Sequence, residues 1–205
     1  MDGTLVDSRA YHWRSWQEAL GAEGVAVTEG QFLATFGRRN DAILRQWLAP
    51  EATPERIRRV GDLKEAAYRR IVERNGLAPL PGVADWVCRL GDAGWRQAVA
   101  SSAPCVNVEV VLRVIGLESR CGAVVAAEDV RHGKPDPEVF LIAAERLGVP
   151  PERCIVVEDV EHGIEAAHRA GMRAVGVGGV AAGDLVVGSL ADLPDDAFDL
   201  LLESR

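Results

Sequence analysis

Four short stretches of this chain carry side chains that together could bind a phosphate group. Asp2-Gly3-Thr4 places a carboxyl group beside a glycine turn, and successive N–H groups in such a turn can wrap an anion. Glu158-Asp159 follows four apolar residues, and two adjacent carboxylates at a buried strand end need a metal, a cation or water beside them. Ser101-Ser102 and Lys134 add hydroxyl groups and a cation.

Each stretch also has an ordinary structural interpretation. Asp-Gly occurs in many simple turns, and Ser101 or Ser102 could cap the helix that follows. Lys134 could be a solvated loop cation. The acidic pair Glu158-Asp159 is the hardest of the four to explain by structure alone, because charged groups at a buried strand end are costly without a partner.

Apolar runs from residue 77 onward predict the elements that would position these groups. Short buried strands are expected at 98–100, 123–126, 154–157 and 174–177, with helices at 83–90, 106–115, 137–147 and 162–170 between them. Asp136 with Pro137 behind it is a predicted helix start. Alternating strands and helices predict an α/β fold with a parallel sheet covered on both faces, whose ligand site lies at the carboxyl ends of the strands. Ser101, Lys134 and Glu158 all fall at that edge.

Residues 8 to 75 have a helical pattern throughout. Thr28 and Thr53 are predicted N-caps, Pro54 stands at a first helical position, and Asn40 or Asp41 begins a helix between them. We therefore predict a core domain formed by residues 1–8 and 77–205, with an all-helical insertion at residues 9–76.

The composition narrows the classes of function and partner further. The 205 residues are 48% hydrophobic and carry a formal net charge of −8, which disfavours a nucleic-acid or anionic-membrane partner. Cys88, Cys105, Cys121 and Cys154 stand singly, as expected of reduced thiols. We see no signal peptide and no apolar run of about 20 residues, so we expect a cytoplasmic protein that acts on a small molecule.

Taken together, the motifs resemble those of the haloacid dehalogenase superfamily, subfamily IA, in its phosphatase and beta-phosphoglucomutase-like branch. The resemblance covers essentially the whole chain and includes a helical cap inserted after the first motif. It rests on four motifs in order: Asp2-Gly3-Thr4-Leu5-Val6-Asp7-Ser8, Val99-Ala100-Ser101-Ser102, Gly133-Lys134-Pro135-Asp136-Pro137 and Val156-Val157-Glu158-Asp159.

The resemblance implies a role for each motif residue. In this superfamily an aspartate attacks the phosphoryl group, and a second aspartate two positions later, matched by Asp2, protonates the leaving oxygen and then activates water. Mg²⁺ would be held by the Asp2 carbonyl, Glu158 and Asp159. The phosphoryl oxygens would be bound, and their developing charge stabilised, by Gly3, Thr4, Ser101, Ser102 and Lys134.

The chain departs from the family pattern at its start. The nucleophilic aspartate belongs one position before Met1, at the end of a strand that is central in the family's sheet. We expect the natural protein to begin some residues earlier, with Met1 inside the motif. The 205 residues alone are predicted to leave two strand edges unpaired, those ending at Ser101 and Glu158, and to form no aspartyl-phosphate.

The helical insertion resembles the cap that selects the substrate in this family. The candidate contacts for the non-phosphate part or a second anion are His12, Gly37, Arg38, Arg39, Asn40 and Lys64. Arg38-Arg39 could equally be a solvated helix entrance. Trp13, Trp16 and Trp47 are interpreted as core of the insertion. Sugar phosphates, phosphoglycolate and related small monoesters are all compatible with this pattern as substrates.

Two alternatives stay open beside a phosphatase. A beta-phosphoglucomutase-like mutase grips a second phosphate with a cap arginine, where this chain has Asn40, and with a Lys-Asn pair, where it has Pro104-Cys105; His12 and Lys64 do match the mutase pattern. A non-catalytic, truncated relative that binds phosphorylated metabolites is the other alternative. Dehalogenase chemistry would leave no role for Glu158 and Asp159, the carboxylates that the resemblance assigns to metal binding. We expect a monomer, with a dimer as the alternative.

Overall fold

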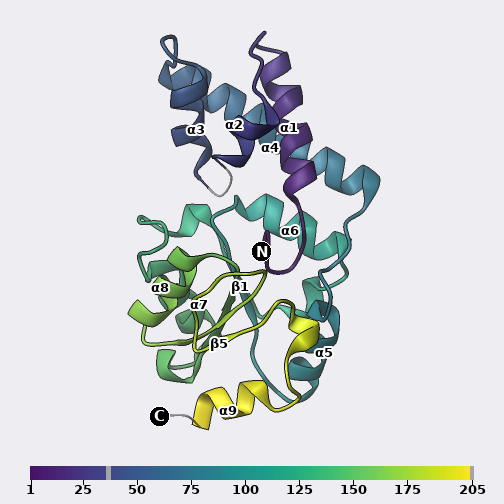
Figure 1. Ribbon diagram of the computed structural model, residues 1–205, viewed down its shortest axis with the longest axis vertical. Helices are drawn as coiled ribbons and strands as arrows, with labels where there is room; N and C mark the ends of the chain where they lie inside the picture. Colours follow the sequence, from purple (N-terminus) through teal and green to yellow (C-terminus); the bar gives the residue numbers. More distant parts are fainter. Residues whose placement is uncertain (36–37, 204–205) are drawn as a thin grey trace. The chain divides into compact units, whose positions relative to one another are not determined.

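The computed structural model describes residues 1–35 and 38–203 (Figure 1). The chain divides into two compact units. The core unit consists of Met1–Asp7 and Leu77–Arg205, and the helical unit consists of Ser8–Gly76. None of the described helices is long and apolar enough to cross a membrane.

The described residues of the helical unit form four helices and no strand. The helices are α1 (Arg9–Gly21), α2 (Glu29–Leu33), α3 (Asn40–Trp47) and α4 (Pro54–Asn75). Both predicted threonine caps are confirmed: Thr28 forms a capping box with Gln31, and the Thr53 hydroxyl accepts a hydrogen bond from the Arg56 N–H. The apolar centre of the unit includes the buried Trp16, with Trp13 and Trp47 packed against it, as predicted.

The core unit alternates strands and helices, which confirms the predicted α/β class. Its elements are α5 (Val83–Asp92), β1 (Ala98–Ala100), α6 (Cys105–Val114), β2 (Ala123–Val125), α7 (Glu138–Leu147), β3 (Ile155–Glu158), α8 (Glu161–Arg169), β4 (Arg173–Gly176), β5 (Leu185–Val186) and α9 (Ala197–Glu203), with single 3₁₀ turns at 118–120, 127–129, 151–153 and 190–192. The strand pairs β1–β2, β3–β4 and β4–β5 are all parallel. The described helices of the core unit therefore serve as crossovers between parallel strands or as covers of their faces.

Two apolar clusters lie on opposite faces of these strands. One joins residues of α5, α6 and α9 and includes Val175 of β4. The other joins residues of α7 and α8 and includes Ala174, the neighbour of Val175 on the same strand. Successive strand residues point to opposite faces, so the core unit has helices on both sides of its strands (Figure 1).

Strands β1 and β3 belong to separate sheets among the described residues. β1 pairs with β2, β3 pairs with β4, and no pairing joins the two sheets. A cavity of about 740 Å³ is lined by residues of both strands, by Met1 and Thr4, and by apolar side chains of α5, α7 and α9. Within the described part of the chain, one edge of β1 and one edge of β3 thus have no strand partner.

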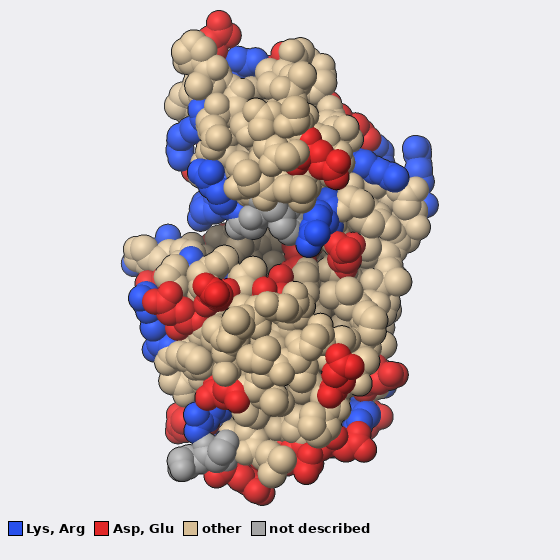
Figure 2. All heavy atoms as spheres, in the orientation of Figure 1, with Lys and Arg blue, Asp and Glu red and all other residues tan. Residues whose placement is uncertain are grey.

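The surface of the core unit carries both signs of charge. On the face shown in Figure 2, red acidic side chains are spread across the unit together with blue basic ones. The whole sequence has a formal net charge of −8.

Candidate active site

The turn at the start of the core unit brings the first and fourth motifs together. Thr4 is buried, and its Oγ1 donates a hydrogen bond to Oδ1 of Asp159 at 2.8 Å. Gly3 has a φ of +77°, and a Cβ added there would overlap the Asp159 carboxylate. Glycine is therefore required at this position for two reasons, the backbone conformation and the close approach of a carboxylate.

Glu158 is the buried carboxylate of the acidic pair. It stands at the end of β3, is 4% exposed and forms an ion pair with the Lys134 ammonium through Oε1. Its Oε2 accepts the Asp159 N–H at 3.0 Å. Burial raises the pKa of Glu158, but the Lys134 ammonium, the N-terminal ammonium and the Asp159 N–H together outweigh burial, and the pKa lies below its ordinary value. Glu158 therefore stays ionised and orients Lys134.

Asp159 has the opposite electrostatic character. Burial raises its pKa above the ordinary value, the neighbouring Glu158 carboxylate raises it further, and the hydrogen bond from Thr4 only partly offsets both effects. A nearby cation would stabilise the ionised form of a carboxylate whose pKa is raised in this way. Because both oxygens of Glu158 already accept hydrogen bonds from the protein, Asp159 is the carboxylate better able to hold a metal ion.

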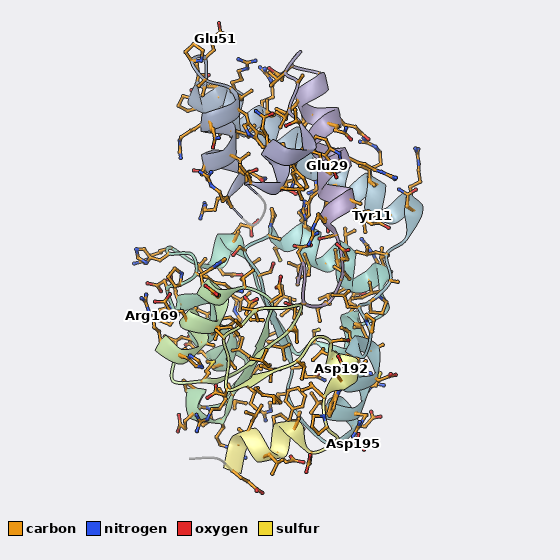
Figure 3. The ribbon with its side chains drawn as sticks, viewed as in Figure 1. Tyr11, Glu29, Glu51, Arg169, Asp192 and Asp195 are labelled. Atoms are coloured by element: carbon orange, nitrogen blue, oxygen red, sulfur yellow. The ribbon has the colours of Figure 1, made fainter. Side chains whose placement is uncertain are left out.

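Lys134 is held in place from several directions. Besides its ion pair with Glu158, its Nζ lies 4.9 Å from the centre of the Phe140 ring. The residue after it, Pro135, is also fixed: its carbonyl oxygen accepts a hydrogen bond of 3.3 Å from Arg169 of α8, which is labelled in Figure 3. These contacts make Lys134 a positioned cation at the strand ends rather than a solvated loop lysine.

The serine pair follows β1 and does not cap the helix after it. Ser101 is 5% exposed, its N–H donates to the Val125 carbonyl, and its Oγ accepts the Ala103 N–H at 3.1 Å. Ser102 is exposed. α6 begins only at Cys105, so the capping interpretation of the serines is wrong. The Ser101 hydroxyl hydrogen remains able to donate to a bound oxyanion.

The start of α7 also differs from expectation. The helix begins at Glu138, one residue later than predicted, because the Asp136 carboxylate accepts the Glu138 N–H and holds the preceding turn. This turn keeps Lys134 on the loop that precedes the helix.

Three of the residues predicted to contact substrate gather within the helical unit. The His12 ring stacks on Tyr68 with centroids 4.2 Å apart, and Lys64, only 3% exposed, lies over the same ring. Lys64 Nζ and Asn40 Nδ2 both contact Oε1 of Glu65, at 2.8 and 2.5 Å. Glu65 was missed in the sequence, although a buried lysine signals that a counter-charge must lie nearby.

The remaining predicted residues lie elsewhere. Arg38 and Arg39 are exposed, and they contact Gln46 and Asp41 respectively, as a solvated helix entrance would. Gly37, another candidate contact, lies outside the described residues.

Comparison with known proteins places the chain in a family. The family described as haloacid dehalogenase-like hydrolase matches residues 1–177, so the chain belongs to this family. It is 35% identical over 181 residues to fructose-1-phosphate phosphatase YqaB of Escherichia coli, covering 86% of this chain and 93% of that one. It is 29% identical over 204 residues to beta-phosphoglucomutase of Bacillus subtilis, covering 94% and 88% of the two chains.

A solved structure agrees with these relatives. The structure of CbbY from Rhodobacter sphaeroides in complex with phosphate superimposes with a TM-score of 0.86 at 27% identity and covers 97% of this chain and 96% of that one. The chain is thus a phosphoric monoester hydrolase of the phosphatase and beta-phosphoglucomutase-like branch.

Proposed function

We propose that the protein is a Mg²⁺-dependent phosphatase that hydrolyses small sugar-phosphate monoesters through an aspartyl-phosphate. The observation that carries the proposal is the meeting of three motifs at one edge of the sheet. Thr4 bonds to Asp159, and Lys134 pairs with the adjacent Glu158. This edge presents hydroxyl, ammonium and carboxylate groups together, as phosphoryl transfer requires.

In the proposed reaction, an aspartate carboxylate oxygen attacks phosphorus and the bond to the leaving sugar oxygen breaks. Asp2, as a carboxylic acid, gives its proton to that leaving oxygen, and the resulting carboxylate then takes a proton from the water that attacks the acyl phosphate. Inorganic phosphate leaves and the aspartate is restored. The family pattern places the attacking aspartate directly before Met1, so the proposal includes a residue at that position.

The phosphoryl group would be bound by this chain's own donors. Lys134, already oriented by Glu158, would neutralise its charge, while the Ser101 hydroxyl would donate to its oxygens. The Gly3 and Thr4 N–H groups donate to the Val6 and Met1 carbonyls in the structure, at 2.8 and 3.3 Å, and would have to exchange these partners to bind the phosphoryl group. Mg²⁺ fits the hard oxygen donors here, and Asp159 with the Asp2 carbonyl would hold it. When bound, the ion would stabilise negative charge on the transferring group.

The substrate class is inferred from the relatives and from the helical unit. The YqaB relative is named for a sugar phosphate, and the beta-phosphoglucomutase relative for a phosphosugar reaction. The cluster of Asn40, Lys64 and Glu65 contains both donors and an acceptor, which suits the hydroxyl groups of a sugar. Phosphoglycolate remains an alternative substrate.

A mutase is the second candidate, supported by the beta-phosphoglucomutase relative and by His12 and Lys64. Against it, Pro104 has no N–H and no charge at the place where the mutase pattern has a lysine. The third candidate is a relative that binds phosphorylated metabolites without turning them over.

One experiment separates these candidates. Mg²⁺-dependent phosphate release from fructose 1-phosphate, glucose phosphates and phosphoglycolate is measured for residues 1–205 and for a protein extended upstream by an apolar strand ending in aspartate. We expect turnover in the extended protein, and its loss in Asp2→Asn and Asp159→Asn. Interconversion of glucose phosphates would support the mutase, and a folded extended protein that binds but releases no phosphate would support the binding protein.

A further inference from the structure

A groove of about 360 Å³ lies on the surface of the helical unit, between α1 and the last turns of α4. Its described lining consists of charged and amide side chains with one aliphatic side chain: Arg14, Gln17 and Glu18 of α1, and Arg70, Ile71, Arg74 and Asn75 of α4. All of these residues belong to one compact unit, so the groove is formed without the core unit. Its volume is in the range of small-molecule sites.

The groove is basic although the protein as a whole is acidic. Among its described lining residues, three arginines stand beside a single carboxylate, that of Glu18, whereas the whole sequence has a formal net charge of −8. Blue basic side chains project from the right-hand side of the helical unit in Figure 2, where the ribbon of Figure 1 shows the C-terminal part of α4. The groove therefore attracts anions locally.

Two of the three arginines are available to an external ligand. Arg70 forms an ion pair with Glu18. The Arg14 and Arg74 side chains are exposed, and within residues 1–35 and 38–203 they form no ion pair or hydrogen bond. The single carboxylate of the groove is thus already engaged, and two guanidinium groups keep all their donors.

The spacing of the arginines is unfavourable without an anion between them. Arg70 and Arg74 stand at positions i and i+4 of α4, where like charges destabilise a helix. Arg74, in the last turn, also interacts favourably with the helix dipole, but Arg14 lies in the middle of α1 and gains nothing from a helix end. A bound anion would remove the repulsion among the three side chains.

We propose that this groove is a second ligand site, separate from the phosphoryl site of the core unit, and that it binds the diphosphate group of a small molecule. Guanidinium groups form paired hydrogen bonds with phosphate oxygens. Arg14 and Arg74 stand on different helices, so each can bind one of two linked phosphates, and the Gln17 amide would add a further donor. The bound ligand would connect α1 to α4. The inference goes beyond the proposed function and does not depend on it.

The test is a titration with pyrophosphate in the absence of Mg²⁺, which pyrophosphate would chelate. Backbone amide signals in NMR spectra locate the site, and calorimetry gives the dissociation constant, for residues 1–205 and for the protein extended upstream. We expect the largest signal shifts at Gln17, Ile71 and Asn75. Inorganic phosphate and ADP are titrated in parallel, to separate a single phosphate and a nucleotide from the diphosphate group alone.

The variants are Arg14→Gln and Arg74→Gln, with Arg58→Gln as the matched control. Arg58 is an exposed arginine of the same helix but lies outside the groove. It precedes Arg70 by three turns or more, about 18 Å at 1.5 Å per residue. All three substitutions replace an exposed arginine with an uncharged residue of good helix propensity, so the helical unit should stay folded.

We expect Arg14→Gln and Arg74→Gln each to weaken pyrophosphate binding about three- to tenfold, since each removes one close charge, and Arg58→Gln to change it less than twofold. Inorganic phosphate should bind more weakly than pyrophosphate at the same residues. ADP should bind at least as tightly as pyrophosphate if the ligand is a nucleotide, and more weakly if it is an inorganic diphosphate. Signal shifts confined to the core unit, no detectable binding, or equal effects of all three substitutions would overturn the inference and leave the proposed phosphatase intact.

Discussion

The Lys134 ammonium and the Glu158 carboxylate form a buried ion pair at the ends of two segments that lie 24 residues apart in the chain. Their side chains are 10% and 6% exposed. A pair buried to this degree is costly to break, because removal of one partner leaves the other charged and desolvated. The pair therefore couples the stability of the core unit to the orientation of its phosphate-binding cation.

Removal of Glu158 should expose this coupling. We expect Glu158→Ala to lower the free energy of unfolding by about 3–5 kcal/mol, because Lys134 loses its partner. The double variant Lys134→Met with Glu158→Leu should be less destabilised than the sum of the single variants Lys134→Met and Glu158→Leu, since no unpaired charge remains. Urea unfolding of the unchanged protein, both single variants and the double variant measures the coupling, and strictly additive losses would contradict the interpretation.

The close approach of Gly3 to Asp159 predicts a specific loss of activity. In Gly3→Ala the new methyl group meets the Asp159 carboxylate, so both the Thr4 hydrogen bond and the acidic group must shift. A displacement of about 1 Å in such a site costs roughly 100-fold in rate. In the protein extended upstream, we expect kcat/KM for a sugar phosphate to fall by about that factor.

Gly116 provides the control for this substitution. Its φ of +73° is similar, but a Cβ there would meet nothing within 4 Å. Gly116→Ala should therefore carry the same backbone strain, of order 1–2 kcal/mol, with activity kept at temperatures where the protein is folded. Equal activity losses in the two variants would show that strain rather than the Asp159 contact is responsible.

Sequence patterns predicted the strand ends at which the site forms, because Ser101 and Glu158-Asp159 directly follow short apolar strands and Lys134 lies on the loop after another strand. They could not predict the division of roles between Glu158 and Asp159. Adjacent residues at a strand end face opposite ways, and only the fold shows which one meets Lys134 and which meets Thr4.

Two elements of the core unit also escaped prediction for physical reasons. β5 has only two residues, too few for an alternating pattern, and is defined by its pairing with β4. α9 (Ala197–Glu203) has only 7 residues, too few for a clear helical pattern, and it packs into the core unit through the buried Phe198 and Leu201. Glu65 was missed for a similar reason, since its neighbour Lys64 becomes buried only in the folded helical unit.

The contact between Glu65 and Lys64 predicts a large stability effect within the helical unit. Lys64 is 3% exposed, and Glu65 Oε1 lies 2.8 Å from its Nζ. Glu65→Ala should lower the free energy of unfolding by about 3 kcal/mol, whereas Glu18→Ala, which removes an exposed ion pair with Arg70, should cost about 1 kcal/mol or less. Chemical denaturation of both variants measures the difference, and similar losses would mean that Lys64 is hydrated in solution.

The Asp184 carboxylate should make the stability of the core unit depend on pH. Its carboxylate accepts the Ala174 N–H at 2.8 Å and pairs with His168 and Arg173 at 3.0 and 2.9 Å. Burial raises the pKa of Asp184, but the Ala174 N–H and the two side chains outweigh burial, and the pKa lies below its ordinary value. The folded state therefore favours the ionised form, and this stabilisation is complete above the unfolded pKa of about 3.9.

The stabilisation by Asp184 should disappear in acid. We expect Asp184→Asn to be less stable than the unchanged protein by about 1–3 kcal/mol at pH 7, because an amide is a weaker acceptor for these donors. The difference should narrow as the pH falls below about 4 and through the lowered pKa of the folded state.

Asp195→Asn is the control, since the Asp195 side chain, labelled in Figure 3, is 90% exposed and its pair with Arg89 contributes little. Urea midpoints measured at several pH values test both variants. A difference between Asp184→Asn and the unchanged protein that stays constant from pH 7 to pH 3 would show that Asp184 stabilises the β4–β5 region by packing rather than by its charge.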